Sequence, residues 1–180
     1  MSSERAADLA LEEIGKLALT QSTEAVRALH ELCVRYSQDA RLWFVLGSLL
    51  VQEGDVVAGE RALRRAVELS PDHAVARFQL GLMQLTSGRA EEAEITWSEL
   101  SHSQPSEALG LYVSGLRALV RDDFVTAREK LSEGLSHEQD PAMAKNMRLI
   151  LEAMPPPAAP NDPETTTHWL LEYASRRTRH

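Results

Sequence analysis

Hydrophobic and small residues recur along this chain with a period of 34 positions. Three segments align with one another without gaps, at residues 40–73, 74–107 and 108–141. Each contains two stretches in which apolar residues return every three or four positions, the spacing that places side chains on one face of an α-helix. A short polar turn separates the two stretches. The pattern therefore predicts three antiparallel helical hairpins and no β-strand.

Glycine occupies the same position of the first helix in all three segments. These glycines are Gly47, Gly81 and Gly115. Inside a helix, glycine costs about 1 kcal/mol relative to alanine, so three of them in register need a structural reason. We expect the second helix of each hairpin to pass close to the glycine. Small residues recur in that second helix as well, at Gly59, Ala93 and Ala127.

Turn residues mark where the helices end and begin. Gly54 and Gly88 follow the first helices of their segments, where a left-handed residue commonly ends a helix. Asp55 is placed to cap the helix that follows. In the third segment, Asp122 and Asp123 replace the glycine turn. Prolines stand at the joints between segments, at positions 71, 105 and 141.

The combined pattern resembles the tetratricopeptide-repeat family, whose unit is 34 residues long. Large residues add to the match at a fixed offset after each glycine, and these are Leu63, Trp97 and Leu131. The third segment departs most, with Ser114 and Gly134 at positions that are larger in the other two. The resemblance covers residues 40–141. It implies an all-α, right-handed α-solenoid of antiparallel helix pairs.

Both ends of the array carry further helical patterns. Residues 1–39 fit a degenerate N-terminal hairpin, in which Glu13 stands where the repeats have glycine. Asp140 and Pro141 form a helix-start signal, so residues 142–154 are expected to form a capping helix. A proline-rich linker follows at residues 155–163. The last residues, 164–180, form an amphipathic segment.

That C-terminal segment carries an apolar cluster at Trp169, Leu170 and Tyr173. A single helix of this length is marginal in water, so we expect it to dock on an apolar surface or to remain disordered. The preferred docking site is the groove described next, reached within the same chain or from a neighbouring one.

The family resemblance implies an inner groove lined by the first helices. Residues at fixed offsets from each glycine trace one stripe along these helices, and the stripe is largely aromatic and aliphatic. We call it the first-helix stripe. Its members are Arg41, Phe44, Ser48, Val51, Phe78, Leu82, Leu85, Tyr112, Leu116 and Leu119. This composition suits an amphipathic helix or apolar peptide and disfavours the acidic chaperone tails that basic grooves bind. Alternatively, a terminal segment of the chain or tight superhelical curvature covers the stripe.

Composition narrows the function further. The 180 residues carry a net charge of −8, and the pI is near 5.3. An acidic chain is poorly suited to nucleic acid or anionic lipid. The only cysteine is Cys33, so no intramolecular disulfide can form. We expect a cytoplasmic protein without a signal peptide or membrane-inserted helix.

The sequence shows no pattern typical of catalysis. It has no glycine-rich phosphate loop, and its six histidines lack the spacing of metal ligands. His73, His102 and His137 lie near joints between repeats, where we expect exposed loop histidines. Cys33 is interpreted as a buried structural thiol. We therefore expect no cofactor, no metal and no enzymatic activity.

The leading hypothesis is a protein–protein interaction module, an adaptor or scaffold. A narrower alternative is a secretion chaperone similar in layout to those of type III translocators. A second alternative is a regulatory or homo-oligomeric assembly subunit that uses the same surfaces on itself. The sequence alone leaves these three open.

Overall fold

A computed structural model describes residues 2–100 and 105–155 of the chain. All regular elements in these ranges are helical, so the predicted all-α fold is confirmed. The helices in chain order are α1 (Ser2–Ala18), α2 (Ser22–Arg35), α3 (Ala40–Gln52), α4 (Val56–Leu69), α5 (Ala74–Thr86), α6 (Ala90–Ser98), α7 (Glu107–Val120), α8 (Phe124–His137) and α9 (Pro141–Ala153).

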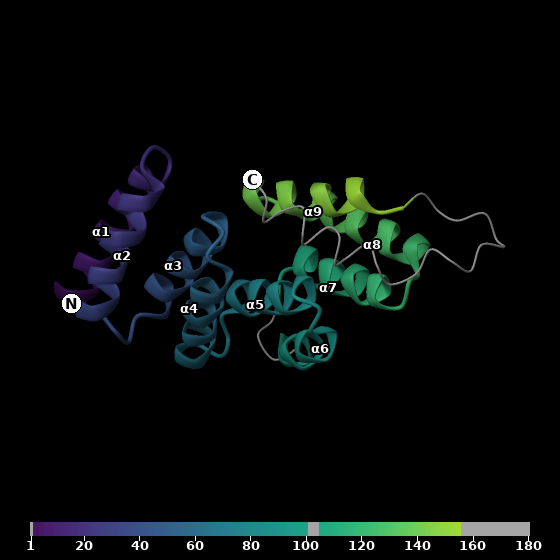
Figure 1. Ribbon diagram of the computed structural model, residues 1–180, viewed down its shortest axis with the longest axis horizontal. Helices are drawn as coiled ribbons and strands as arrows, with labels where there is room; N and C mark the ends of the chain where they lie inside the picture. Colours follow the sequence, from purple (N-terminus) through teal and green to yellow (C-terminus); the bar gives the residue numbers. More distant parts are fainter. Residues whose placement is uncertain (1, 101–104, 156–180) are drawn as a thin grey trace. The chain divides into compact units, whose positions relative to one another are not determined.

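The chain divides into two compact units, residues 1–80 and 81–180. The first unit contains α1 to α4 and the start of α5 (Figure 1). Its consecutive helices pack against one another, α1 on α2, α2 on α3 and α3 on α4. Leu29, Cys33, Leu42 and Leu46 are almost completely buried in its core.

The second unit contains the rest of α5 and α6 to α9. Helix α7 packs on α6 and α8, and α8 packs on α9, which lies along it in Figure 1. Leu116, Leu131 and Met147 are fully buried there. Each unit thus has its own apolar core built from neighbouring helices.

The turns follow the sequence prediction closely. Gly54 and Gly88 adopt the left-handed region, with φ of 87° and 77°. Asp122 adopts it too, with φ of 57°, so an aspartate takes the place that glycine holds in the other repeats. The carboxylates of Asp55 and Asp123 accept hydrogen bonds from Ala58 N and Thr126 N, both at 3.0 Å. Asp55 thus caps α4 as expected, and Asp123 caps α8 in the same way.

The glycines in register lie where two helices meet, which confirms their predicted packing role. A Cβ atom added to Gly47 would lie 2.8 Å from Leu63 Cγ, and one added to Gly115 would lie 2.8 Å from Leu131 Cγ. Both partners are on the second helix of the same hairpin. Any side chain at these positions would push the two helices apart.

The N-terminal hairpin lacks this close crossing. Glu13, which stands at the glycine register, is exposed, whereas the neighbouring Ile14 is buried. Ala25, Leu29 and Cys33 form the buried face of α2. A charged residue is tolerated at position 13 because its side chain faces solvent.

Helix α9 begins and ends at specific polar contacts. The Asp140 carboxylate accepts from Ala142 N at 2.8 Å, and Pro141 is the first helical residue. At the other end, Arg128 Nη2 donates to Met154 O at 3.1 Å and to Pro155 O at 2.7 Å. Arg128, which comes from α8, therefore satisfies carbonyls that no backbone donor within α9 can reach.

Candidate functional site

The first-helix stripe begins on α3 with a charged residue that is already paired. Arg41 is exposed, and its guanidinium donates to both carboxylate oxygens of Asp39, at 3.0 and 2.7 Å. Hydrogen bonds from Arg41 hold the pKa of Asp39 below its usual range. The same carboxylate caps α3 through Arg41 N. Arg41 thus interacts with the residue that caps its own helix, α3.

The middle of the stripe on α3 is half-buried and combines aromatic and polar groups. The ring of Phe44 lies 4.8 Å from the ring of His73, centroid to centroid, with the planes tilted by 43°. Ser48 Oγ lies 2.8 Å from Gln79 Oε1 and donates a hydrogen bond to it. On this part of the stripe, the first unit therefore presents the aromatic ring of Phe44 and the hydrogen-bonded amide of Gln79.

His73 differs from the prediction of an exposed loop histidine. It is half-buried, and burial lowers the pKa of its imidazole below the ordinary value of 6.5. Its Nδ1 accepts from Ala76 N at 3.3 Å, near the start of α5. The prediction was wrong because a residue at a joint between repeats can also pack against the preceding first helix, as His73 does against Phe44 of α3. His137 is exposed as expected, and His102 lies outside the described residues.

The members of the stripe on α5 and α7 are more deeply buried than those on α3. Phe78, Tyr112 and Leu116 have no exposed surface, and Leu82 keeps only 9%. Leu85 and Leu119 are also buried. Helix α7 as a whole is buried over most of its circumference, which is unusual for a helix at the surface of an array.

Two members of the stripe also pack inside their own hairpins. Val51 Cγ2 lies 2.6 Å from the position of a Cβ atom on Gly59, and Tyr112 Cε1 lies at the same distance from one on Gly134. Burial raises the pKa of the Tyr112 hydroxyl above its ordinary value. These two side chains therefore contribute to hairpin packing as well as to the stripe.

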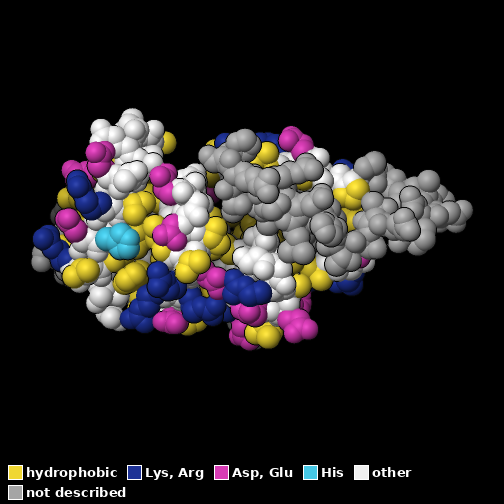
Figure 2. Space-filling view, in the orientation of Figure 1, with side chains coloured by type: hydrophobic (Ala, Val, Ile, Leu, Met, Phe, Trp, Pro, Cys, Tyr) yellow, Lys and Arg dark blue, Asp and Glu magenta, His cyan; other side chains and the backbone are white. Residues whose placement is uncertain are grey.

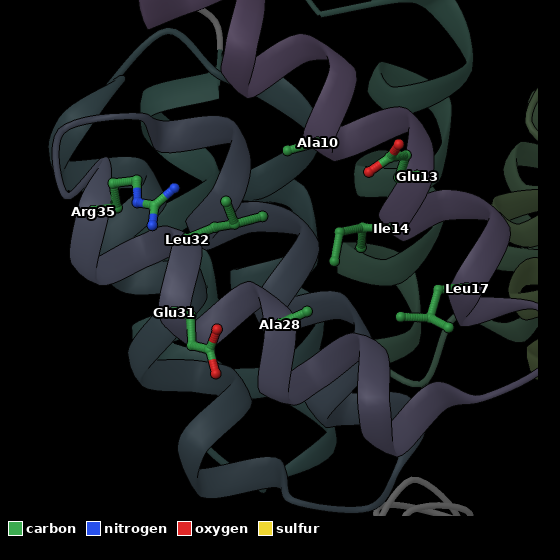
Figure 3. A pocket seen from close by; sticks show the side chains of 8 residues that line it. All are labelled: Ala10, Glu13, Ile14, Leu17, Ala28, Glu31, Leu32 and Arg35. Atoms are coloured by element: carbon green, nitrogen blue, oxygen red, sulfur yellow. The ribbon is translucent and has the colours of Figure 1, made fainter.

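A shallow groove between α1 and α2 was not foreseen. It has a volume of about 300 Å³ and lies within the first unit (Figure 3). Ile14 projects from α1 toward Ala28 and Leu32 of α2, and these residues form its apolar floor. Glu13, Glu31 and Arg35 stand at its exposed rim. The signal in the sequence was weak, because floor residues such as Leu17 and Leu32 follow the same helical spacing as core residues.

The groove has few of the features that a catalytic pocket needs. Polar groups do not converge on its floor, and the three charged side chains are exposed. Within the described ranges, no three potential metal ligands lie together. Cys33 is buried as predicted, and burial raises the pKa of its thiol to about 11.

Charged side chains are mixed over the visible surface of the first unit. Figure 2 shows acidic, basic and hydrophobic side chains interspersed over α1 to α4 on this face. Large apolar side chains are exposed on the second helices, among them Val57 and Ile95, each 69% exposed. None of the described helices is both long and apolar enough to span a bilayer. The predicted docking residues Trp169, Leu170 and Tyr173 lie outside the described part of the chain.

Comparison with known proteins supports the repeat pattern directly. Residues 46–108 match the family described as tetratricopeptide repeat. Tetratricopeptide repeat protein 8 of Caenorhabditis elegans is 34% identical over 59 residues, which cover 33% of this chain and 12% of the relative. Cellulose synthase operon protein C of Pseudomonas fluorescens (strain SBW25) is 31% identical over 86 residues, 48% of this chain and 7% of the relative. The chain therefore spans a small part of each relative.

Proposed function

We propose that this chain, whose residues 46–108 match the tetratricopeptide-repeat family, is a protein-interaction module that holds an amphipathic helix of a partner. The proposed contact surface is the first-helix stripe. The observation that carries the proposal lies on α3, where the stripe positions Phe44 and Val51 are apolar and only half-buried, so part of each side chain remains open to a partner. A helix face intended only for water would carry polar residues there.

The chemistry of the stripe favours an apolar helix face over an acidic peptide. Helix-in-groove recognition depends on apolar anchors spaced three or four residues apart. In the first unit, Phe44 can supply part of the receiving surface, and Ser48 with Gln79 can supply hydrogen bonds. Arg41 is already paired with Asp39, so it is less available to bind a carboxylate of a partner.

The proposed role is binding rather than catalysis, in the cytosol. An adaptor, a secretion chaperone and an assembly subunit would all use the same stripe, and they differ in the partner rather than in the site. Identification of the segment that contacts the stripe therefore decides among them.

Photo-crosslinking from single positions tests the proposal. A benzoylphenylalanine is placed at Phe44 in the first unit or at Leu82 in the second, in the full chain in its native cell. Matched controls carry it at Val57 and Ile95, which are exposed on second helices. We expect crosslinks to an amphipathic segment of another protein from the stripe positions, at least 10-fold more abundant than from the controls.

Two outcomes would overturn the proposal. Equal crosslinking from Val57 and Phe44 would indicate non-specific adhesion to exposed apolar residues. Crosslinks from the stripe positions only to segments of this same chain, under all growth conditions, would make the stripe a purely internal packing surface.

A further inference from the structure

The α1/α2 groove is an open apolar surface bordered by charged side chains. Its floor residues Leu17, Ala28 and Leu32 are only half-buried, so a ligand can reach them. Glu13 of α1 and Glu31 of α2 lie on opposite sides of the floor (Figure 3). The groove therefore presents an apolar centre between two acidic side chains.

No neighbouring side chain neutralises these charges. Glu13, Glu31 and Arg35, the last residue of α2, are exposed, and none of the three forms an ion pair with another described residue. The lysine of α1, Lys16, is already paired with Glu12 at 2.8 Å. A ligand that complements the groove would thus carry an apolar residue with cations beside it and an anion near Arg35.

Helix α9 of this chain exposes that combination of side chains. It packs on α8 through a buried apolar face, which leaves the opposite face open to solvent. Leu149 lies on the open face and is 39% exposed. Around it are Lys145, Arg148 and Glu152, which are exposed and form no ion pair within the described part of the chain.

The charges of α2 and α9 also match in order. Four positions on each helix follow the spacing i, i+3, i+4, i+7, and these are Ala28, Glu31, Leu32 and Arg35 on α2 and Lys145, Arg148, Leu149 and Glu152 on α9. That spacing belongs to any helical stripe, whereas the signs of the charges are particular to these two helices. Laid parallel, the helices place Arg148 opposite Glu31. Glu152 then falls opposite Arg35, about 6 Å further along both axes.

The remaining cation meets the other glutamate in the same register. Lys145 falls at the level of Ala28, toward which Ile14 of α1 projects (Figure 3). Glu13 is the neighbour of Ile14 in the chain, on the rim of the groove. All three rim charges of the groove thus find an opposite charge on α9.

Another exposed apolar residue of the second unit has the wrong charges for this groove. Ile95 on α6 is 69% exposed, but it lies one helical turn from Glu91 and Glu92. In the groove these carboxylates would approach Glu13 and Glu31, and like charges would oppose binding.

We propose that α9 of a second copy binds in the α1/α2 groove, with Leu149 on the apolar floor. This inference goes beyond the proposed function, because it uses surfaces other than the first-helix stripe. The two contacting surfaces differ, so each copy can donate α9 and receive it, which produces open chains or rings. One helix in one groove is a small interface, below about 1,200 Å², so the association is weak and depends on concentration.

Sedimentation velocity of the purified full chain tests the association. We expect the mean sedimentation coefficient to rise with protein concentration and to rise less in high salt, because exposed charges are screened. Glu31→Lys and Arg148→Glu should each weaken association about 10-fold or more, since repulsion replaces attraction. Glu91→Lys, at an exposed position of α6, is the matched control and should leave it unchanged. A coefficient that stays constant up to about 1 mM would refute the proposal.

A charge swap between two chains tests the pairing itself. When Glu31→Lys chains are mixed with Arg148→Glu chains, each groove meets an α9 of opposite charge, and association should return. Recovery would also show that both variants are folded. If both variants keep the thermal melt of the natural sequence and their mixture stays dissociated, Glu31 and Arg148 do not pair between copies.

Photo-crosslinking identifies the site and the chain. Benzoylphenylalanine at Leu149 should crosslink Ile14 or Leu32 of another molecule, seen in mixtures of isotope-labelled and unlabelled chains. The same probe at Ile95 is the control. Crosslinks confined to one molecule would overturn binding of a second copy. Crosslinks to Phe44 would place α9 on the first-helix stripe and overturn the choice of groove.

Failure of this proposal is distinguishable from failure of the proposed function. Loss of self-association in Glu31→Lys should leave crosslinks from Phe44 to a foreign segment intact. Self-association without any foreign crosslink from Phe44 would remove only the partner-binding function.

Discussion

The indole ring of Trp97 on α6 lies directly against the backbone of Gly81 on α5. A methyl group at Gly81 would lie 2.6 Å from Trp97 Cε2, a separation that real Cβ atoms do not tolerate. The ring is rigid and 98% buried, since only 2% of Trp97 is exposed. The absence of a side chain at position 81 is therefore a requirement of this hairpin.

We predict that Gly81→Ala lowers the free energy of unfolding by about 1–3 kcal/mol, because the methyl group overpacks the contact with Trp97. Gly81→Leu should cost more. Gly110→Ala is the matched control, since a Cβ atom at Gly110 meets nothing within 4 Å. That change should stabilise the protein by about 0.5–1 kcal/mol through helix propensity. Urea unfolding measures both, and equal midpoints for the two variants would contradict the packing role.

Arg128→Lys should loosen the end of α9. A lysine has one nitrogen in place of the two guanidinium nitrogens, Nη1 and Nη2, that reach Leu151, Met154 and Pro155. We expect a loss of about 1–3 kcal/mol and faster hydrogen exchange at Met154 N, which donates to Ile150 O. Arg148→Lys, at an exposed position of α9, is the control. Unchanged exchange at Met154 in Arg128→Lys would argue against the clamp.

Stability should fall as the solution is acidified through the ordinary pKa of histidine. Burial lowers the pKa of His73 in the folded state, with Asp72 opposing the shift, so the unfolded chain binds a proton more readily. The contribution of the neutral His73 to the free energy of unfolding is therefore intact above the unfolded pKa of 6.5, and it is lost as the pH falls below that value. Because only one proton is involved, the unfolding free energy can change by at most about 1.4 kcal/mol per pH unit.

His73→Asn checks this assignment, because asparagine can still accept from Ala76 N but does not titrate. We expect its unfolding free energy to vary less between pH 7 and pH 5 than that of the natural sequence. Parallel pH profiles for the two proteins would show that another group causes the acid sensitivity.

Cys33 should be almost inert in the folded protein. Burial raises its pKa from 9.0 to about 11, which means about 100-fold less thiolate at pH 8, and only 1% of its surface is exposed. We expect iodoacetamide to alkylate it more than 100-fold more slowly than glutathione. In a urea series, labelling should rise together with the unfolding of the first unit. Rapid labelling in native buffer would mean that the α2 core opens readily.

The period of the sequence predicted the helices and their close crossings well. Gly47, Gly81 and Gly115 could be assigned to helix contacts because the helical repeat determines which residues share a face. The caps at Asp55 and Asp123 could be predicted for the same reason, since capping involves residues only three positions apart.

The candidate site could be predicted only in part. The sequence predicted the apolar stripe, which stays a prediction as a binding surface, and it could not show that Val51 and Tyr112 also pack on Gly59 and Gly134. That depends on the rotation of one helix against another, which periodicity does not specify. The α1/α2 groove was missed because its floor and a filled core have the same composition.

By itself, then, the sequence determined the helices, their order, their caps and the glycine crossings, all of which arise from interactions within one hairpin. The tertiary structure decided the contacts that join distant positions. Arg128 donates hydrogen bonds to carbonyls at the end of α9. The ring of His73 packs against that of Phe44, and Ser48 donates a hydrogen bond to Gln79. The physical reason is distance along the chain: helical geometry relates neighbours a few residues apart, whereas these pairs are 23 to 31 positions apart and meet only once whole helices have packed.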